Sequence, residues 1–241
     1  MATELPSVWA REPKPQRDQR ALSREHIVTE AIGLLDEEGV EALSMRKLGA
    51  RLNAGATSLY THVANKDELI ELVVDEVFGE VKVANVTPER GWREAATTLA
   101  YDVRATILRH PWVASALGGV GLIYLGPNMS NLSEDILGLF EAGGFTLEQA
   151  DHAMSILVSY VLGTTSADAA LRSLIARSGQ DERELTRRLR PLMARAAQGH
   201  TRLRTLMEAR PDEDRSQGNA IGFAEGVRWI LDGFEAQLET A

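Results

Sequence analysis

Residues 42–66 of this 241-residue chain read ALSMRKLGARLNAGATSLYTHVANK and decide the fold of its N-terminal part. Two short apolar patterns flank Asn53-Ala54-Gly55, which predicts two helices joined by a tight turn. The first helix is capped by Ser44 and runs to about Leu52, and the second covers roughly residues 57–62. Gly55 is expected to supply the backbone freedom that the turn requires. The side chains expected to face inward are Leu48, Leu52, Leu59 and Val63.

The same window contains no acidic residue, although the whole chain has a formal net charge of −9. Its cationic side chains are Arg46, Lys47, Arg51 and Lys66. Carboxylates on a surface that meets phosphate would repel it, so their absence favours nucleic acid as the partner. The pattern therefore predicts a helix-turn-helix element that places its second helix in a DNA major groove. The alternative is a solvated helical hairpin with incidental basic residues.

The exposed polar side chains of the hairpin suggest how DNA would be contacted. Short hydroxyl side chains at a helix start can approach phosphates and base edges closely. Tyr60 offers a hydroxyl to a phosphate, and Thr61 offers a methyl and a hydroxyl to bases. The Arg46 guanidinium matches O6 and N7 of guanine, and Lys66 can neutralise a phosphate. Helical spacing turns further polar side chains to the same side, namely Thr57, Ser58 and His62.

Residues 1–22 form a predicted basic arm ahead of the first helix. Two prolines, Pro13 and Pro15, prevent a helix there, so the arm is expected to be flexible or extended. Beside a DNA-reading element, such an arm is expected to reach phosphates or the minor groove. The alternative is a disordered solubilising tail. The arm residues expected to contact DNA are Arg11, Lys14, Arg17 and Arg20.

The remainder of the chain predicts an all-α protein, because no stretch shows sustained period-two alternation. A helix capped by Ser23 should end at Gly39, and a fourth helix should open at Asn65. Thr87-Pro88 predicts the start of a helix that reaches residue 109. Later helices are expected near 130–142, 146–171 and 220–238. A boundary between Val83 and Thr87 gives a helix-turn-helix domain over 23–84 and a ligand-binding and dimerisation domain over 85–241.

Several classes of function lack their sequence signatures here. The chain has no cysteine, and its five histidines show no metal-binding spacing, so no metal site and no cofactor are expected. No nucleophile elbow or phosphate loop is present, so no enzyme is expected. The N-terminus does not resemble a secretory signal, and no run approaches the ~20 apolar residues of a membrane span. We expect a cytoplasmic protein with no membrane partner.

Residues 22–77, from LSREHIVTEAIGLLDEEG through ALSMRKLGARL to TSLYTHVANKDELIELVVDEV, resemble the N-terminal domain of the tetracycline-repressor (TetR) family. The resemblance implies an all-α homodimer with helix-turn-helix domains and a helical ligand-binding domain. Such proteins are usually repressors that a small molecule releases from operator DNA. The positions that match DNA-contacting residues of the family are Ser44, Arg46, Thr57, Ser58, Tyr60, Thr61, His62 and Lys66.

The second half is similar to the tetracycline-binding branch at residues 144–150 and 160–163, but it departs from that branch at the drug site. The segment from Gly118 to Pro127 lacks the histidine that binds the metal in that branch. The branch's acidic residue on the metal side corresponds to a position near Ala167, where only Asp168 is close. We therefore expect an effector other than magnesium–tetracycline. Candidate residues for lining its pocket are Trp92, Trp112, Met129, Phe140, Met154 and Tyr160. The alternative for each residue is ordinary core packing.

These observations lead to the interpretation of the chain as a ligand-responsive transcriptional repressor. Its expected partners are near-palindromic double-stranded operator DNA, a small-molecule effector such as an antibiotic or natural product, and a second copy of itself. The last two long helices are the expected dimer faces in a four-helix bundle. Alternatives with the same fold are an activator, a regulator that acts without ligand, and a helical adaptor that does not bind DNA.

Overall fold

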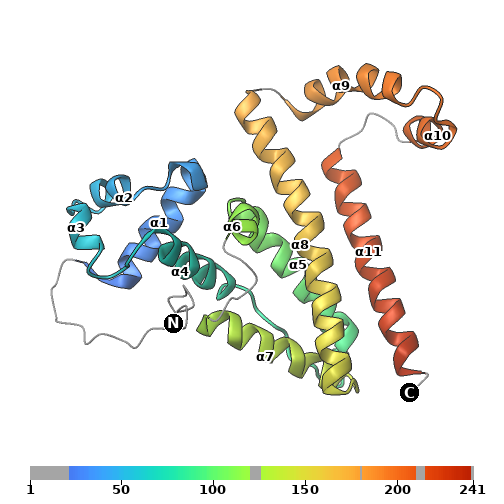
Figure 1. Cartoon of the computed structure of the whole chain (residues 1–241). Coiled ribbons are helices and arrows are strands. Elements are labelled where there is room, and N and C mark those ends of the chain that lie inside the picture. The colour runs from blue at the N-terminus through green and yellow to red at the C-terminus, as the bar shows by residue number, and fades with distance from the viewer. Residues whose placement is uncertain (1–21, 120–125, 180, 210–214, 240–241) are drawn as a thin grey trace, which may run out of the picture.

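The computed structural model describes residues 22–119, 126–179, 181–209 and 215–239, and within those ranges the chain is helical and contains no strand. The all-α prediction is therefore confirmed. Figure 1 shows an N-terminal head of short helices, a central bundle in which α5, α8 and α11 lie side by side, and a helical extension. The basic arm over residues 1–21 lies outside the described residues.

The head consists of α1 (Arg24–Glu38), a short 3₁₀ turn η2 (Val40–Ala42), α2 (Met45–Arg51), α3 (Ala56–Leu59) and α4 (Lys66–Phe78). Side-chain caps set where its longer helices begin. The oxygens of Ser23, Ser44 and Asn65 accept the backbone N–H three residues later, at 3.1, 3.2 and 2.8 Å. Gly39, with φ +80°, ends α1, as its sequence position predicted.

The C-terminal part begins with α5 (Trp92–Arg109), α6 (Val113–Gly119) and α7 (Pro127–Ala142). It continues with α8 (Leu147–Ser178), α9 (Glu182–Ala196), α10 (Thr201–Ala209) and α11 (Arg215–Leu238). A capping box opens α8 through two bonds: Thr146 N–H donates to Gln149 Oε1 at 2.8 Å, and Gln149 N–H donates to Thr146 Oγ1 at 3.3 Å. The helices α9 and α10 stand away from the bundle (Figure 1).

Two expectations about helix ends are wrong. Thr87 does not start a helix but closes a turn with Arg90, whose backbone N–H donates to Thr87 Oγ1 at 3.1 Å, and α5 begins only at Trp92. The second helix of the hairpin, α3, ends at Leu59, and residues 60–62 follow as turns rather than as helix.

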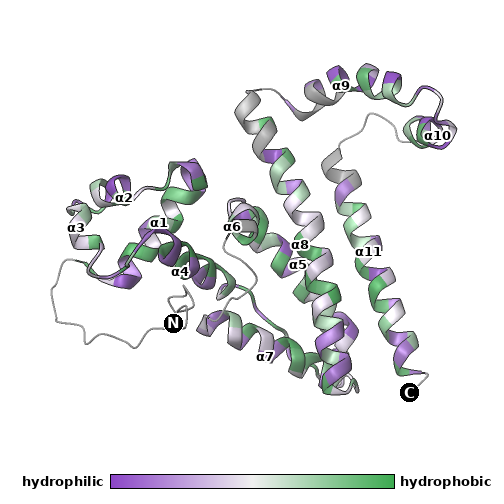
Figure 2. Ribbon diagram, viewed as in Figure 1, coloured by the Kyte–Doolittle hydropathy of each residue, from purple (hydrophilic) through white to green (hydrophobic). Residues whose placement is uncertain are grey.

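The bundle buries α5 against α8, and both α7 and α11 pack against that pair. Phe223, Val227 and Leu231, which are four residues apart, form the buried stripe of α11. Figure 2 shows the corresponding apolar bands along α8 and α11. Residues 147–172 of α8 are long and apolar enough by composition to cross a membrane, so the expectation that no segment reaches this threshold is wrong. Only 28 % of the residues in its most apolar window are buried within the chain.

Candidate nucleic-acid interface

The turn between α2 and α3 depends on Gly49 and Asn53, and not on Gly55 as the sequence suggested. A Cβ on Gly49 would lie 2.8 Å from the Ala54 carbonyl oxygen and 3.3 Å from the Ala56 nitrogen, so only glycine lets the chain fold back this closely. Asn53 takes the left-handed conformation with φ +50°, which asparagine tolerates. Gly55 has φ −66°, a value that any residue adopts, and open space around it.

The apolar residues of the hairpin face inward as predicted. Leu48, Leu59 and Val63 are at most 1 % exposed, and Leu52 is partly buried. Their packing presents the opposite side of α2 and α3 to solvent. The exposed residues on that side are Ser44, Arg46, Thr57, Ser58, Tyr60 and Thr61, and His62 is half-buried beside them. The predicted DNA-contacting residues of α2 and α3 are therefore open to solvent or half-buried, and we call the exposed side of the hairpin that they form the α2–α3 surface.

The cations of this region differ in how they are engaged. Arg51 donates from Nε to Glu30 at 2.7 Å and from Nη1 to Glu37 at 2.6 Å, and this contact lowers the pKa of the Glu37 carboxyl. Lys47 pairs with Glu38 of α1. Residues 42–66 contain no acidic side chain, but glutamates of α1 neutralise two of their four cationic side chains, Lys47 and Arg51.

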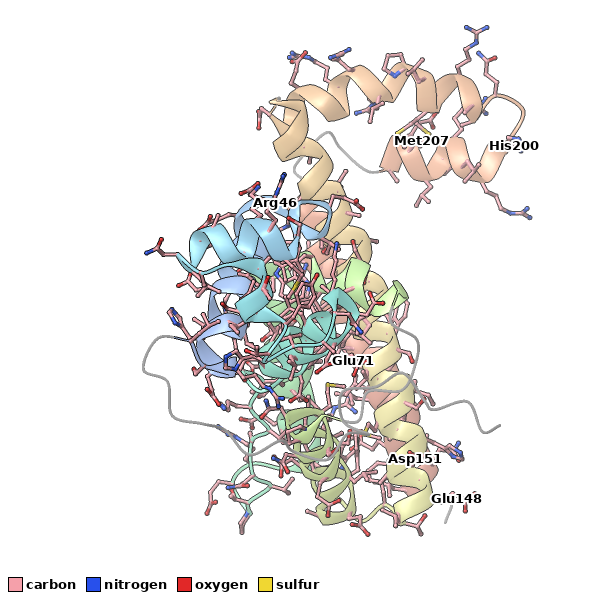
Figure 3. The ribbon with its side chains drawn as sticks, turned by 60° about the vertical axis from the view of Figure 1, so that its left-hand side comes forward. Arg46, Glu71, Glu148, Asp151, His200 and Met207 are labelled. Atoms are coloured by element: carbon pink, nitrogen blue, oxygen red, sulfur yellow. The ribbon has the colours of Figure 1, made fainter. Side chains whose placement is uncertain are left out.

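Arg46 is the cation on the α2–α3 surface that stays free. It has no hydrogen-bond or ion-pair partner among the residues that the structure describes, and it lies at the outer edge of the head (Figure 3). Lys66 is half-buried, and its Nζ donates to the Val40 carbonyl oxygen at 3.4 Å. Ser44 already accepts the N–H of Lys47 at 3.2 Å, so its hydroxyl oxygen is partly occupied. Arg46 is consequently the best placed cation for a base or phosphate.

Two carboxylates, neither of which is marked by a sequence pattern, tie the head to the C-terminal part. Asp36 on α1 accepts from His110 Nδ1 and from Trp112 Nε1, each at 2.7 Å. Asp75 on α4 accepts the backbone N–H groups of Asn128 at 3.3 Å and Met129 at 2.9 Å, and so caps the N-terminus of α7. We call these two sets of contacts the Asp36 joint and the Asp75 joint. The Asp36 joint lies just before α6, and the Asp75 joint lies at the start of α7.

The Asp75 joint is closely packed. Asp75 is 4 % exposed, and a Cβ on Gly126 would lie 2.0 Å from its Oδ1, so glycine is required where the chain passes over the carboxylate. Burial raises the pKa of Asp75 above its usual value, while the two backbone donors act in the opposite direction. A buried carboxylate held by a helix start gives α4 and α7 a fixed relative position.

The six residues predicted to line an effector pocket occupy different surroundings. Trp92 and Phe140 lie together, with ring centroids 6.2 Å apart, and Phe140 is fully buried in an aromatic cluster with Phe145 and Phe234. Trp112 lies at the joint with α1, and the Met129 N–H lies at the joint with α4. Tyr160 stacks on Phe223, and its hydroxyl donates to the carbonyls of Gly222 and Phe223. Met154 is half-buried on α8.

A groove of about 400 Å³ lies between residues 83–86 and α7. Its walls are the apolar side chains of Val83, Val86 and Leu139, with the carboxylates of Glu134 and Asp135 at the same place. None of the six predicted pocket residues lines it. Part of the Gly-rich segment that the sequence placed near the drug site, residues 120–125, lies outside the described residues.

Comparison with known proteins supports a regulatory identity. Residues 27–73 match the model of bacterial regulatory proteins of the tetR family, and residues 86–238 match the tetracyclin repressor-like C-terminal domain. An HTH-type transcriptional regulator from Saccharopolyspora erythraea is 39% identical over 166 residues, which cover 69% of this chain and 69% of that protein. The HTH-type transcriptional repressor DrrR1 from Streptomyces coeruleorubidus is 29% identical over 237 residues, which cover 98% and 86% of the two chains.

A solved structure shows the same architecture. The TetR family protein ActR from Streptomyces coelicolor, in complex with actinorhodin, is 29% identical and superposes with a TM-score of 0.73 over 90% of this chain and 98% of its own. Helix-turn-helix head, helical C-terminal part and sequence similarity therefore agree. The chain belongs to the TetR family of bacterial transcriptional regulators.

Proposed function

We propose that this regulator acts as a homodimeric repressor that binds a near-palindromic operator through its two α2–α3 surfaces and leaves it when a small molecule binds. The observation that carries the proposal is the α2–α3 surface itself, where a free Arg46 and exposed hydroxyl side chains sit on a well-packed hairpin. Regulators of this family bind DNA and small-molecule ligands and act as dimers.

The DNA contacts divide into two groups by what the side chains already bind. Arg46, Thr57 and Tyr60 are exposed, and no partner holds them among the described residues, so we assign them the closest contacts. Ser58 and Thr61 lie beside them, with the Thr61 hydroxyl donating to the Ser58 carbonyl at 2.7 Å. Ser44, His62 and Lys66 are assigned supporting roles at the edge of the surface. We also retain the basic arm as a phosphate contact through Arg11, Lys14, Arg17 and Arg20.

The dimer is assigned to α8 and α11. Large apolar side chains of these helices remain exposed in the single chain: Ile156 is 50 %, Ile221 57 % and Trp229 62 % exposed. Pairing two such helices from each chain in a four-helix bundle would bury them. This arrangement also accounts for the apolar composition of α8 without a membrane, which is consistent with a cytoplasmic regulator that acts on DNA. The domain boundary near residues 83–87 fits a head that moves relative to this bundle.

Release from DNA requires that effector binding favour a different head position. The two joints supply a route, because Asp36 bonds to residues just before α6 and Asp75 bonds to the start of α7. An effector that displaces α6 and α7 would move α1 and α4 together and change the spacing of the two α3 helices. ActR is solved with actinorhodin, so this compound is the first effector to test. Family members are regulators rather than enzymes in general, and we propose no catalysis.

A gel-shift titration tests the proposal. Wild type should bind a duplex from upstream of its own gene, with affinity that falls steeply with salt, and a released fraction should appear when the right effector is added. Tyr60→Phe should weaken binding by about fivefold, the equivalent of one hydrogen bond. Tyr101→Phe, which removes a hydroxyl from an exposed tyrosine on α5, is the matched control and should bind as wild type. Absence of any salt-sensitive binding by wild type would contradict the proposal.

A further inference from the structure

A polar cluster lies where α5, α8 and α11 meet. Arg104 on α5 donates from Nη2 to Asp168 Oδ2 on α8 at 2.7 Å, and the other Asp168 oxygen accepts from Asn219 Nδ2 on α11 at 2.5 Å. The Arg104 and Asp168 side chains are only 13 % and 12 % exposed. The guanidinium carbon also lies 4.9 Å from the centre of the Phe223 ring. Both oxygens of Asp168 are thus occupied by protein donors.

Two buried groups on α5 and α8 have no hydrogen-bond partner among the residues that the structure describes. One is the Arg104 Nε–H, because the ion pair with Asp168 uses only Nη2. The other is the hydroxyl of Thr165, a residue that is 0 % exposed. A buried donor without an acceptor costs stability, and such groups in native proteins call for a missing partner.

Thr165 is unusual beside its own neighbour. Thr164 donates its hydroxyl to the Tyr160 carbonyl at 2.8 Å, the bond that a helical threonine makes with the preceding turn. Thr165 makes no such bond among the described residues and keeps its hydroxyl available. It lies three residues before Asp168 on α8, a spacing that places two side chains next to each other on a helix. The spacing therefore puts Thr165 on the turn of α8 next to Asp168, which pairs with Arg104.

We infer that the Arg104 Nε–H and the Thr165 hydroxyl form the polar end of the effector site, and that they bind one oxygen acceptor of the effector, a carboxylate or a ketone. Both groups donate, so the ligand atom must accept, and an oxygen with two lone pairs can take both bonds. A flat aromatic body suits the surroundings, since Phe223 lies against Arg104 and is flanked by Tyr101 and Tyr160. This inference rests on the proposed function, which requires an effector.

Three probes of matched shape test the inference by calorimetry on the full-length protein. They are the β-naphthyl carboxylate, the β-naphthyl methyl ketone and β-isopropylnaphthalene, which share one aromatic body and differ in the acceptor. Wild type should bind at least one oxygen-bearing probe about tenfold more tightly than the isopropyl compound. The stronger of the two oxygen probes then identifies the acceptor as anionic or neutral.

Three variants locate the effect. Thr165→Val removes the free hydroxyl at nearly constant shape and should abolish most of the tenfold preference while leaving the melting temperature unchanged or higher. Thr164→Val is the matched control, because its hydroxyl is bonded within the helix, and it should keep the preference. Arg104→Lys keeps a cation beside Asp168 but removes the Nε–H, and it should also lose the preference.

The same preparations are tested for binding to the upstream duplex, which separates the two proposals. If the wild-type protein does not bind the upstream duplex, the proposed function is contradicted. Normal operator binding with equal affinity for all three probes, or with no binding of any probe at its solubility limit, overturns the inference. A preference that survives in Thr165→Val also overturns it, because a trapped water would then be the partner of the hydroxyl.

Discussion

The α2–α3 surface and the Arg104 cluster both contain polar groups that have no partner among the residues that the structure describes, but one set is in water and the other is not. Arg46 and Tyr60 are exposed, with Tyr60 at 51 %, so water satisfies them until DNA arrives. The Arg104 Nε–H and the Thr165 hydroxyl are excluded from water. An exposed group without a partner is common and says little alone, whereas a buried one points to a ligand or water.

The difference also shows how each region is built. The side chains of the α2–α3 surface are positioned by the backbone of the hairpin, which can close because Gly49 has no Cβ. In the bundle, hydrogen bonds join Arg104, Asp168 and Asn219 from three helices. A substitution there removes a bond, whereas a substitution of Gly49 shifts the backbone. Substitutions in the two regions should therefore have effects of different size and kind.

The largest effect is expected for Gly49→Ala. The new Cβ would lie 2.8 Å from the Ala54 carbonyl oxygen, so α3 must shift, and operator affinity should fall by about 100-fold. Fluorescence anisotropy with the upstream duplex measures this loss. Gly55→Ala is the matched control: its φ of −66° and open surroundings predict unchanged affinity. Equal losses in the two variants would show that the close approach of Gly49 to the Ala54 carbonyl does not decide operator affinity.

Arg46→Ala should have the next largest effect. A guanidinium that binds a base edge contributes about 1–3 kcal/mol, so affinity should fall by roughly tenfold or more. Lys47→Ala, one residue later, removes a cation that Glu38 already engages and should lower affinity by less than about threefold. Titrations at two salt concentrations compare the variants. A larger loss for Lys47→Ala than for Arg46→Ala would contradict our assignment of the free cation.

Asp75→Asn extends the comparison to a buried polar group that has partners. Burial raises the pKa of Asp75 above its usual 3.8, so the folded state holds this proton more tightly than the unfolded state does. The contribution of Asp75 to stability therefore rises as pH falls through the raised pKa towards 3.8. The free energy of unfolding of wild type minus that of Asp75→Asn should increase from neutral pH to about pH 4.

Denaturant titrations of the two proteins across this range measure that difference. Other carboxyls whose pKa is lowered, Glu25, Glu37 and Glu89, lose their stabilising contribution on acidification in both proteins and cancel in the subtraction. A difference that shrinks on acidification would mean that the two backbone N–H groups outweigh burial at this carboxylate.

The smallest effect is expected for Tyr160→Phe. The variant removes a hydroxyl that donates to two carbonyls at 3.2 Å each and keeps the ring on Phe223, so the free energy of unfolding should fall by about 1 kcal/mol. Operator affinity should not change, because Tyr160 lies in the bundle. A change in operator affinity without a change in stability would place Tyr160 in the coupling route instead.

The head was predictable from sequence because its signals are local. Ser23, Ser44 and Asn65 each bond to the N–H three residues later, so the sequence alone places these helix starts. Thr87-Pro88 shows the limit of that reasoning, since the same hydroxyl can cap a turn instead of a helix. Gly55 shows another: a glycine in a turn need not be the one that the turn requires.

The bundle was less predictable because its contacts join distant residues. Asp168 lies 64 residues from Arg104 and 51 from Asn219, and no periodicity marks such a pairing. The pairing of Arg51 with Glu30 and Glu37 was missed for the same reason, and the charge of the hairpin was therefore overstated. In the sequence, Asp36 and Asp75 cannot be distinguished from ordinary surface acids of amphipathic helices, because their partners Trp112 and Met129 lie 76 and 54 residues away.

Hydroxyl-radical footprinting of the wild-type protein on DNA from upstream of its own gene tests the central claim most directly. The account predicts two protected patches about one helical turn or a multiple apart, related by a near-palindrome, each losing protection in Gly49→Ala but not in Gly55→Ala. Uniform or absent protection at physiological salt, or protection that survives in Gly49→Ala, would contradict it.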